Sequence, residues 1–403
     1  MDTNPDVNEL STELLSIHSL NSFISNNAPP RGVMFAGHFS QRLEITGSEP
    51  NLNQTGVEEE FGKYTFSIKM PENGTIVAVL PKYPETIGND VIHFNPETTV
   101  IYRSHETGEF DYFVIPYYAS YHPTFGFRYE EKPALRELAV NREFPKDTVF
   151  ADTPAVKGES HYTFGRNLNV VAMSSPNVGL DGYVISRDVL PHFGFKMYEN
   201  RSISFGANEF PLNIYGDDTR YQAFPEIGEM IREDGLLVAL RRFDPHLSPA
   251  LLSQKDLQEV DYLFDNKVYV RAGAGKVVDI TIVKSTNINL QLPEEMTAQF
   301  NKYSRATLRY YTDLTRFEEQ QILDNKRQGG TGDIAITPKL QQLLVEAKAV
   351  INYRGRESKQ PITLAYRKEP LDGWLVNITV EYEVTPNRGY KFTCQNGGGP
   401  NLH

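Results

Sequence analysis

Two adjacent carboxylates, Asp217 and Asp218, lie in the segment Tyr-Gly-Asp-Asp. Aspartates at this spacing can hold Mg²⁺ for phosphoryl transfer, because the ion neutralises charge that develops on phosphate oxygens. The same residues are also common in hairpin turns, since Gly and Asp adopt the backbone angles that tight turns require. The sequence favours the turn over the metal site.

A glycine-rich segment, Ala-Gly-Ala-Gly-Lys at 272–276, invites comparison with phosphate-binding loops. Such a loop needs a Ser or Thr after the lysine and a further glycine upstream, and both are missing here. The chain has one cysteine, Cys394, and nine histidines without ligand spacing. We therefore predict no disulfide and no intrinsic metal site.

The charge balance limits what the chain can bind. It has 403 residues, with 52 Asp and Glu against 40 Lys and Arg, so the net charge is −12. Coating nucleic acid requires concentrated positive charge, so any polynucleotide contact must be local or shared with a more basic partner. No apolar run approaches the roughly 20 residues of a membrane span, and the acidic start is unlike a signal peptide. We expect a cytosolic, globular protein with two or three domains and no membrane contact.

Most of the predicted elements are strands. Short alternating runs recur between Ile68 and Tyr118, with Pro, Gly and Asn between them, which is typical of an antiparallel or barrel-like β domain. Residues 374–386 alternate with period 2 and predict a further strand. The stretch 162–190 contains two apolar runs, 170–173 and 183–186, which predict two strands joined by a wide polar loop.

Helical spacing predicts a docking arm at 8–25, which two prolines in 26–32 end before a β-rich region begins. Residues 246–261 predict a short helix that begins at Ser248. Residues 294–327 and 336–351 predict two helices that form an antiparallel hairpin. The inward positions of the hairpin are Met296, Phe300, Tyr303, Tyr310, Leu314, Phe317, Leu340, Leu343, Leu344 and Ala347.

An aromatic cluster occupies residues 117–129. Its rings could stack the bases of a single strand, but packing within a core is the commoner use, and we favour packing.

Several motifs resemble, in the same order, those of the β subunit of multisubunit DNA-directed RNA polymerases. Segments 224–245 and 269–283 resemble strands of that family's flap, or wall. Leu180 replaces the glutamate of the family's acidic pair. The other matching residues are Gly37, Gln41, Arg42, Pro50, Thr55, Gly56, Glu58, Ala151, Asp152, Pro154, Gly165, Asn167, Val170, Met173, Asp181, Ile185 and Ser186.

The resemblance implies two groups of binding residues. Gln41 and Arg42 correspond to a motif beside the RNA–DNA hybrid, with Arg166 and Asn167 as further nucleic-acid contacts; for Arg42, a solvated turn is an equal alternative. The predicted helix at 246–261 corresponds to the family's flap-tip helix, which contacts promoter-specificity factors. Its expected factor-docking residues are Leu251, Leu252 and Leu257.

The C-terminal segment resembles the start of the family's lysine signature, at Gly389, Lys391, Asn396 and Gly397. In the family, two lysines point into the catalytic centre of a double-psi β-barrel and hold nucleotide phosphates and the RNA 3′ end. Gly399 replaces the second lysine here. The resemblance therefore implies Lys391 and Asp181 as catalytic residues, with a merely solvated lysine as the alternative for Lys391.

The resemblance implies a mainly β fold with α insertions (α+β), in which a double-psi β-barrel and hybrid-binding region carry an inserted flap domain with a helical hairpin. The expected divisions are a docking arm at 1–29, the barrel and hybrid-binding part at 30–190, a flap-like domain at 191–375 with its hairpin at 294–351, and a returning barrel strand with the lysine motif at 376–403.

The chain resembles a piece of a split β subunit of the kind that large phages encode. The implied partners are β′-like subunits, the remaining β fragments, a promoter-specificity factor, template DNA, nascent RNA and nucleoside triphosphates. Mg²⁺ is expected in the assembled enzyme, held mainly by the β′-like partner, and the chain alone would be inactive. The expected location is the host bacterial cytoplasm or a virion. The rival hypothesis is a non-catalytic interaction or virion protein that retains a degenerate fold of this type.

Overall fold

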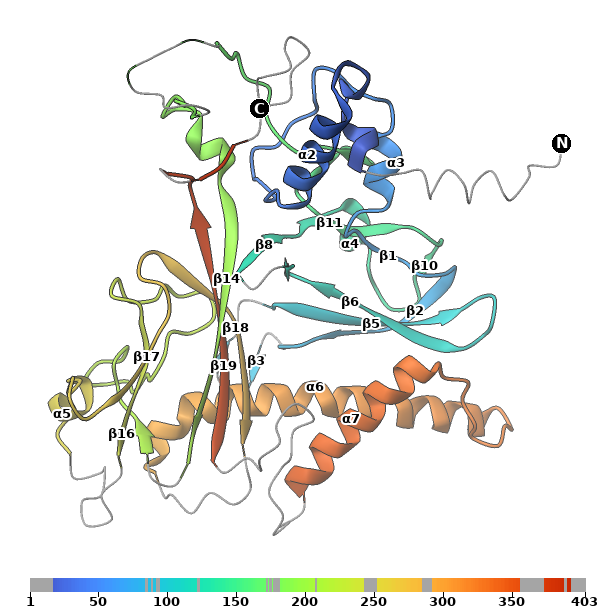
Figure 1. Ribbon diagram of the computed structural model, residues 1–403. Helices are drawn as coiled ribbons and strands as arrows, with labels where there is room; N and C mark the ends of the chain where they lie inside the picture. The colour runs from blue at the N-terminus through green and yellow to red at the C-terminus, as the bar shows by residue number, and fades with distance from the viewer. Residues whose placement is uncertain are drawn as a thin grey trace.

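Sheet predominates over helix in the protein (Figure 1), giving the mixed α+β fold that the sequence predicts. The computed structural model describes residues 17–392 except 84–85, 88–89, 92–94, 122–123, 172, 174–175, 177–181, 207–208, 243–251, 285–291, 356–372 and 388–389. None of the helices in these ranges is both long and apolar enough to cross a bilayer.

The longest strands form a five-stranded antiparallel sheet in the order β18-β19-β14-β8-β7. β14 (Phe195–Phe205) and β19 (Trp374–Val384) pair residue for residue along their whole length. β18 (Gly275–Lys284) covers the other edge of β19, whereas β8 (Phe125–Arg128) and β7 (Tyr118–Ser120) extend the sheet beyond β14. The predicted C-terminal strand is therefore confirmed, as a central strand of the main sheet.

Both faces of β19 are buried. Val376, Ile378 and Val380 project into the largest apolar cluster, where they lie with side chains of β14 and β18. On the opposite face, Glu381 is also buried and accepts a hydrogen bond of 2.9 Å from the Tyr198 hydroxyl. A strand buried on both sides cannot show the usual apolar-in, polar-out contrast in exposure, although its side chains still alternate between two different environments.

A second sheet has the order β10-β2-β5-β6, formed by Glu143–Phe144, Gly74–Pro81, Glu97–Ser104 and Phe110–Pro116. β-Bulges interrupt the registers of β2 with β5 and of β18 with β19, and bulges of this kind bend and twist strands. Smaller sheets contain β1 (Ile68–Lys69), β11 (Val149–Asp152) and β9 (Glu130–Glu131); β12 (Val156–Lys157) and β13 (His161–Tyr162); β15 (Glu209–Pro211), β16 (Leu236–Arg242) and β17 (Asn266–Tyr269); and β3 (Thr86–Ile87) and β4 (Asp90–Val91).

The helical hairpin is confirmed as α6 (Glu294–Arg327) and α7 (Pro338–Gly355), which pack against each other beneath the second sheet (Figure 1). α6 joins three apolar clusters, because Met296, Phe300 and Leu314 each belong to a different one. Leu340, Leu344 and Ala347 of α7 are buried in the cluster that includes Leu314, as their spacing predicts. The hairpin therefore connects three apolar clusters of the protein through α6.

Most of the described rings of the aromatic cluster pack against other side chains of the protein, whereas Tyr121 is 41% exposed. Phe127 is buried, the Tyr118 ring stacks on Tyr198 with centroids 4.4 Å apart, and Phe125 contacts Phe195 at 5.9 Å. His122 lies outside the described residues.

Two predictions near the N-terminus need correction. Most of the predicted arm lies outside the described residues, and its remainder forms two single-turn helices, η1 (Ile17–Leu20) and η2 (Ile24–Asn26). The two prolines begin a helix instead of preceding a β region: α2 spans Pro29–Ser40. Proline suits the first turn of a helix because the N–H it lacks would have no partner there. Two shorter helices come later in the chain, α3 (Glu58–Lys63) and α4 (Pro133–Arg136).

The two strands predicted within 162–190 are absent from the described residues of that stretch. None of Val170, Val171, Met173 and residues 183–186 lies in a strand, and Val171 and Val184 are 77% and 72% exposed. A single-turn helix, η3 (Leu190–Phe193), leads from this stretch into β14.

The expected domain boundaries do not separate the sheets. The main sheet contains β8 from the 30–190 range, β18 from the 191–375 range and most of β19 from the last range. These parts of the chain therefore share one hydrogen-bonded sheet and one apolar cluster.

Candidate functional site

The Asp217–Asp218 pair forms a turn. The Asp217 carboxylate accepts hydrogen bonds from the Thr219 hydroxyl at 2.6 Å and from the backbone N–H groups of Thr219 and Arg220 at 2.8 and 2.9 Å. These bonds, led by that of the Thr219 hydroxyl, hold the pKa of Asp217 below its usual value. Across the described ranges, no three metal-ligating side chains gather at one place. These residues offer no ligand set for Mg²⁺, so we assign the ion no step on this chain.

Residues 43–52 form the scaffold of the candidate site. Ile45 bridges to Phe195 at the start of β14, and the N–H groups of Thr46 and Gly47 donate to the carbonyls of Gly194 and His192 at 2.8 and 3.1 Å. A side chain at position 47 would approach the His192 oxygen to 2.4 Å, so only glycine fits there. This segment ties the start of the main sheet to the residues that come after β13.

Arg42 and Gln41 lie where α2 meets this scaffold, but only Gln41 is exposed. The Arg42 guanidinium pairs with the buried carboxylate of Glu44 at 2.9 Å and lies over the rings of Phe39 and Tyr162, 4.9 and 5.1 Å from their centroids. Arg42 is therefore already engaged by an anion and two aromatic faces. Arg42 is therefore neither a solvated turn residue nor a free cation that could contact a nucleic-acid backbone.

Arg166 and Asn167 are also occupied by the scaffold. Arg166 donates to the Gly47 carbonyl at 3.0 Å and lies 3.8 Å from the Glu49 carboxylate. The Asn167 side chain donates to Glu49 and to the Pro50 carbonyl at 3.2 and 2.8 Å, and its oxygen accepts from the Leu52 N–H at 3.0 Å. These side chains hold residues 47–52 in place, which is a positioning role.

Lys391 differs from these residues, because its neighbours are anchored while its own side chain is exposed. Its neighbours are anchored, since the Tyr390 ring packs on Phe195 with centroids 5.7 Å apart and the Phe392 ring packs edge-on against Phe193 at 5.2 Å. Lys391 itself is exposed, and no hydrogen bond or ion pair holds its ammonium among the described residues. The arrangement therefore offers a cation on a fixed backbone that can bind an external anion such as a phosphate.

The remaining predicted residues do not join this group. Asp181 and Leu251 lie outside the described residues. The docking face expected of the other two leucines is wrong, because Leu257 is 3% exposed and Leu252 packs against the same internal cluster. The helix is shorter than predicted, α5 (Gln254–Gln258), and Ser253 caps it by accepting from Asp256 N–H. The exposed apolar side chains lie just beyond it, at Leu263 and its neighbours Tyr262 and Phe264.

The structure thus brings together motifs that are far apart in the sequence. Residues 165–167 contact the scaffold, the scaffold contacts the start of β14, and Tyr390 packs on that same start of β14. The sequence did not indicate Glu49, although it binds both Arg166 and Asn167. A lone glutamate in a loop carries no pattern that could have identified it.

No protein-family model matches the chain, and no curated protein matches it.

Proposed function

We propose that the chain is a subunit of a multisubunit DNA-directed RNA polymerase and contributes the β side of its active centre. The observation that carries the proposal is that three separate β-like motifs lie together: residues 165–167 contact residues 43–52, and both residues 43–52 and Tyr390 contact the start of β14. Motifs that serve one site must meet in space, whereas chance matches along 403 residues would have no reason to do so.

Within this proposal the residues divide by role. Lys391 would contact a phosphate of the incoming nucleotide or the RNA 3′ end, as a compact point charge on a flexible stem. Arg42, Arg166 and Asn167 would position the surrounding backbone, because their polar groups are already bonded within the chain. Mg²⁺, held mainly by a β′-like partner, would neutralise charge on the transferred phosphate.

The exposed segments beside the scaffold support an assembled state. Val171, Met173 and Val184 are 77%, 70% and 72% exposed, although their sequences are typical of buried strands. We propose that strands of a partner chain cover them and complete a double-psi β-barrel. The partner would supply the apolar surface that covers these exposed side chains.

The experiment is to tag the chain in its native source, isolate it at physiological salt and identify the chains that accompany it. We expect β′-like chains with an aspartate triad, and a complex that extends an RNA primer on a template scaffold when Mg²⁺ and nucleotides are present. A stable lone monomer would contradict the proposal. A defined complex that never adds a nucleotide would instead support the non-catalytic interaction or virion protein.

A further inference from the structure

Two ring contacts hold the short segment that carries Lys391. The Tyr390 ring lies 5.7 Å from the Phe195 ring, and the Phe392 ring meets the Phe193 ring at 5.2 Å with an interplanar angle of 89°. Such an edge-to-face pair is a favoured arrangement, because the positive edge of one ring faces the negative face of the other. Residues 390 and 392 therefore both dock on residues 193–195.

This docking determines the direction of Lys391. Side chains two positions apart lie on the same side of an extended segment, and the residue between them points the other way. Lys391 is exposed, whereas Tyr390 and Phe392 are half-buried. The two rings therefore face the protein, and the lysine between them faces away from it.

Residues 192–195 also hold the scaffold at 43–52. The Gly194 carbonyl accepts from the N–H and the hydroxyl of Thr46 at 2.8 and 3.2 Å, and the His192 carbonyl accepts from the Gly47 N–H at 3.1 Å. Phe195 begins β14 and is 1% exposed, so the end of this segment is fixed in the main sheet. Half-buried Phe193 is the ring through which the fixed segment contacts Phe392.

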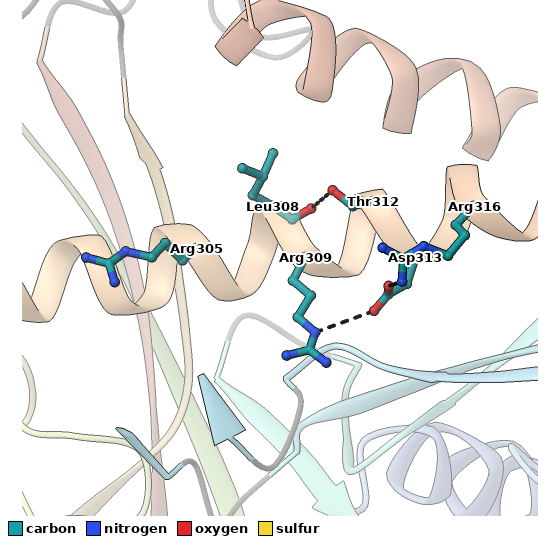
Figure 2. A pocket seen from close by; sticks show the side chains of 6 residues that line it. All are labelled: Arg305, Leu308, Arg309, Thr312, Asp313 and Arg316. Atoms are coloured by element: carbon teal, nitrogen blue, oxygen red, sulfur yellow. Dashed lines mark hydrogen bonds and ion pairs between the residues drawn. The ribbon is translucent and has the colours of Figure 1, made fainter. Parts of the chain in front are cut away.

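The arginines of α6 show a different way to hold a cation. In a shallow groove along this helix (Figure 2), Asp313 pairs with Arg316 at 3.1 Å and with Arg309 at 3.8 Å. A carboxylate that fixes a cation also neutralises it. Rings on the neighbouring residues fix the backbone instead, and no hydrogen bond or ion pair holds the Lys391 ammonium among the described residues. Its full charge is therefore free for a ligand.

We propose that Phe193 is a positioning residue for Lys391. Together with Phe392 it forms an aromatic clamp, which fixes the backbone of residues 390–392 and directs the Lys391 ammonium toward an external phosphate. A lysine ammonium sits on a flexible stem, so the space it can reach depends on where the backbone is held. The phosphate as ligand rests on the proposed function, whereas the clamp rests on the ring contacts.

The clamp is tested first without catalysis. A nitroxide spin label is attached at Lys391→Cys in the full chain, after Cys394, the single cysteine, has been changed to serine. Phe193→Ala should release the backbone and sharpen the electron paramagnetic resonance lines of the label, whereas Phe193→Tyr, which keeps the ring, should leave them broad. Phe35→Ala is the matched control, because Phe35 is also half-buried and pairs with the Phe39 ring at 5.6 Å. Lines that Phe193→Ala leaves unchanged, or that Phe35→Ala sharpens equally, would overturn the clamp.

The consequence for chemistry is tested by single-nucleotide addition with the native complex at saturating nucleotide. Phe193→Ala should slow addition by about 10- to 100-fold, since a displacement of about 1 Å can cost that much in rate. In a chain that already carries Lys391→Ala, the same change should cost less than about twofold, because no ammonium is left to position. Phe193→Tyr and Phe35→Ala should match the wild type. Equal slowing by Phe193→Ala in both backgrounds would overturn the positioning role, because a general loss of structure does not depend on Lys391.

The two measurements separate this inference from the proposed function. Sharpened lines in Phe193→Ala, together with a complex that adds no nucleotide, would support the clamp and contradict the polymerase assignment. Unchanged lines, together with an active wild-type complex, would overturn the clamp and leave that assignment standing.

Discussion

The cations of this chain differ in what they are free to bind. Arg42 is held by Glu44 and two aromatic rings, and Arg166 by Gly47 and Glu49, so each would have to abandon internal partners to contact a phosphate. Lys391 has no such partner within the described ranges. At the scale of single residues, Lys391 is therefore the best candidate for chemistry at the convergence of motifs.

A half-buried carboxyl group at Glu97 gives the chain a pH dependence. Burial is the main cause that raises the pKa of Glu97 above 4.5; nearby Asp279 adds to this, while Lys82 opposes it. A pKa that is higher in the folded state than in the unfolded state gives stability that is fully present below about 4.5 and is lost as the pH rises through the folded pKa.

We therefore expect Glu97→Gln to be more stable than the wild type at pH 7, and the two to converge below pH 4.5. Urea unfolding from pH 4 to 7 measures this difference. Glu259→Gln is the control, because Glu259 is 69% exposed. A wild type that gains stability over Glu97→Gln as the pH rises would show that the charged form of Glu97 is favoured by folding.

At the scale of elements, α5 is held by the apolar cluster that its Leu257 joins. Leu257 is 3% exposed in an apolar cluster, whereas Leu263 is 87% exposed just beyond the helix. We expect Leu257→Ala to lower the free energy of unfolding by about 2 to 5 kcal/mol, because it removes buried methyl groups and leaves a cavity. Leu263→Ala should change it by less than about 0.5 kcal/mol. Equal effects in urea unfolding would mean that α5 does not pack as described.

Helices and strands were predictable where the chain itself supplies the neighbours. The apolar spacing of α6 and α7 indicates their buried sides, because each finds its partner within the hairpin or the second sheet. The apolar runs at 170–173 and 183–186 have an equally strong pattern, yet the described residues there are exposed, apart from half-buried Ile185. Apolar periodicity indicates that a segment favours burial. It does not indicate which surface buries the segment.

At the candidate site, the sequence predicted which residues lie close together but not what each of them does. Ordered motifs selected Arg42, Arg166 and Asn167, which do meet on one scaffold. Their hydrogen bonds to Gly47, Glu49 and Pro50 could not be foreseen, because contacts between residues more than 100 positions apart depend on the folded backbone. The prolines before α2 show the same limit locally, since Pro can end one helix or begin the next.

At the scale of the whole molecule, one antiparallel sheet links parts of the chain that the motifs assign to different regions. β14 and β19 run from the scaffold end of the molecule toward α6 (Figure 1), so the candidate site and the hairpin share a rigid connection. Under the proposed function the site would need this connection, because groups that act on a phosphate must be held within fractions of an ångström. The exposed segments at the scaffold end mark where we expect partner chains to complete the assembly.

The most direct test of this account is single-nucleotide addition by the native complex on a preformed RNA–DNA scaffold, at saturating nucleotide. Lys391→Ala should slow addition by about 30- to 1000-fold, which corresponds to the loss of one charge-assisted phosphate contact worth about 2 to 4 kcal/mol in the transition state. Assembly and template binding should be unchanged. Lys255→Ala is the control, since Lys255 is 79% exposed and far along the chain from the scaffold. If Lys391→Ala adds nucleotides within twofold of the wild-type rate, Lys391 is not part of the active centre and the central claim fails.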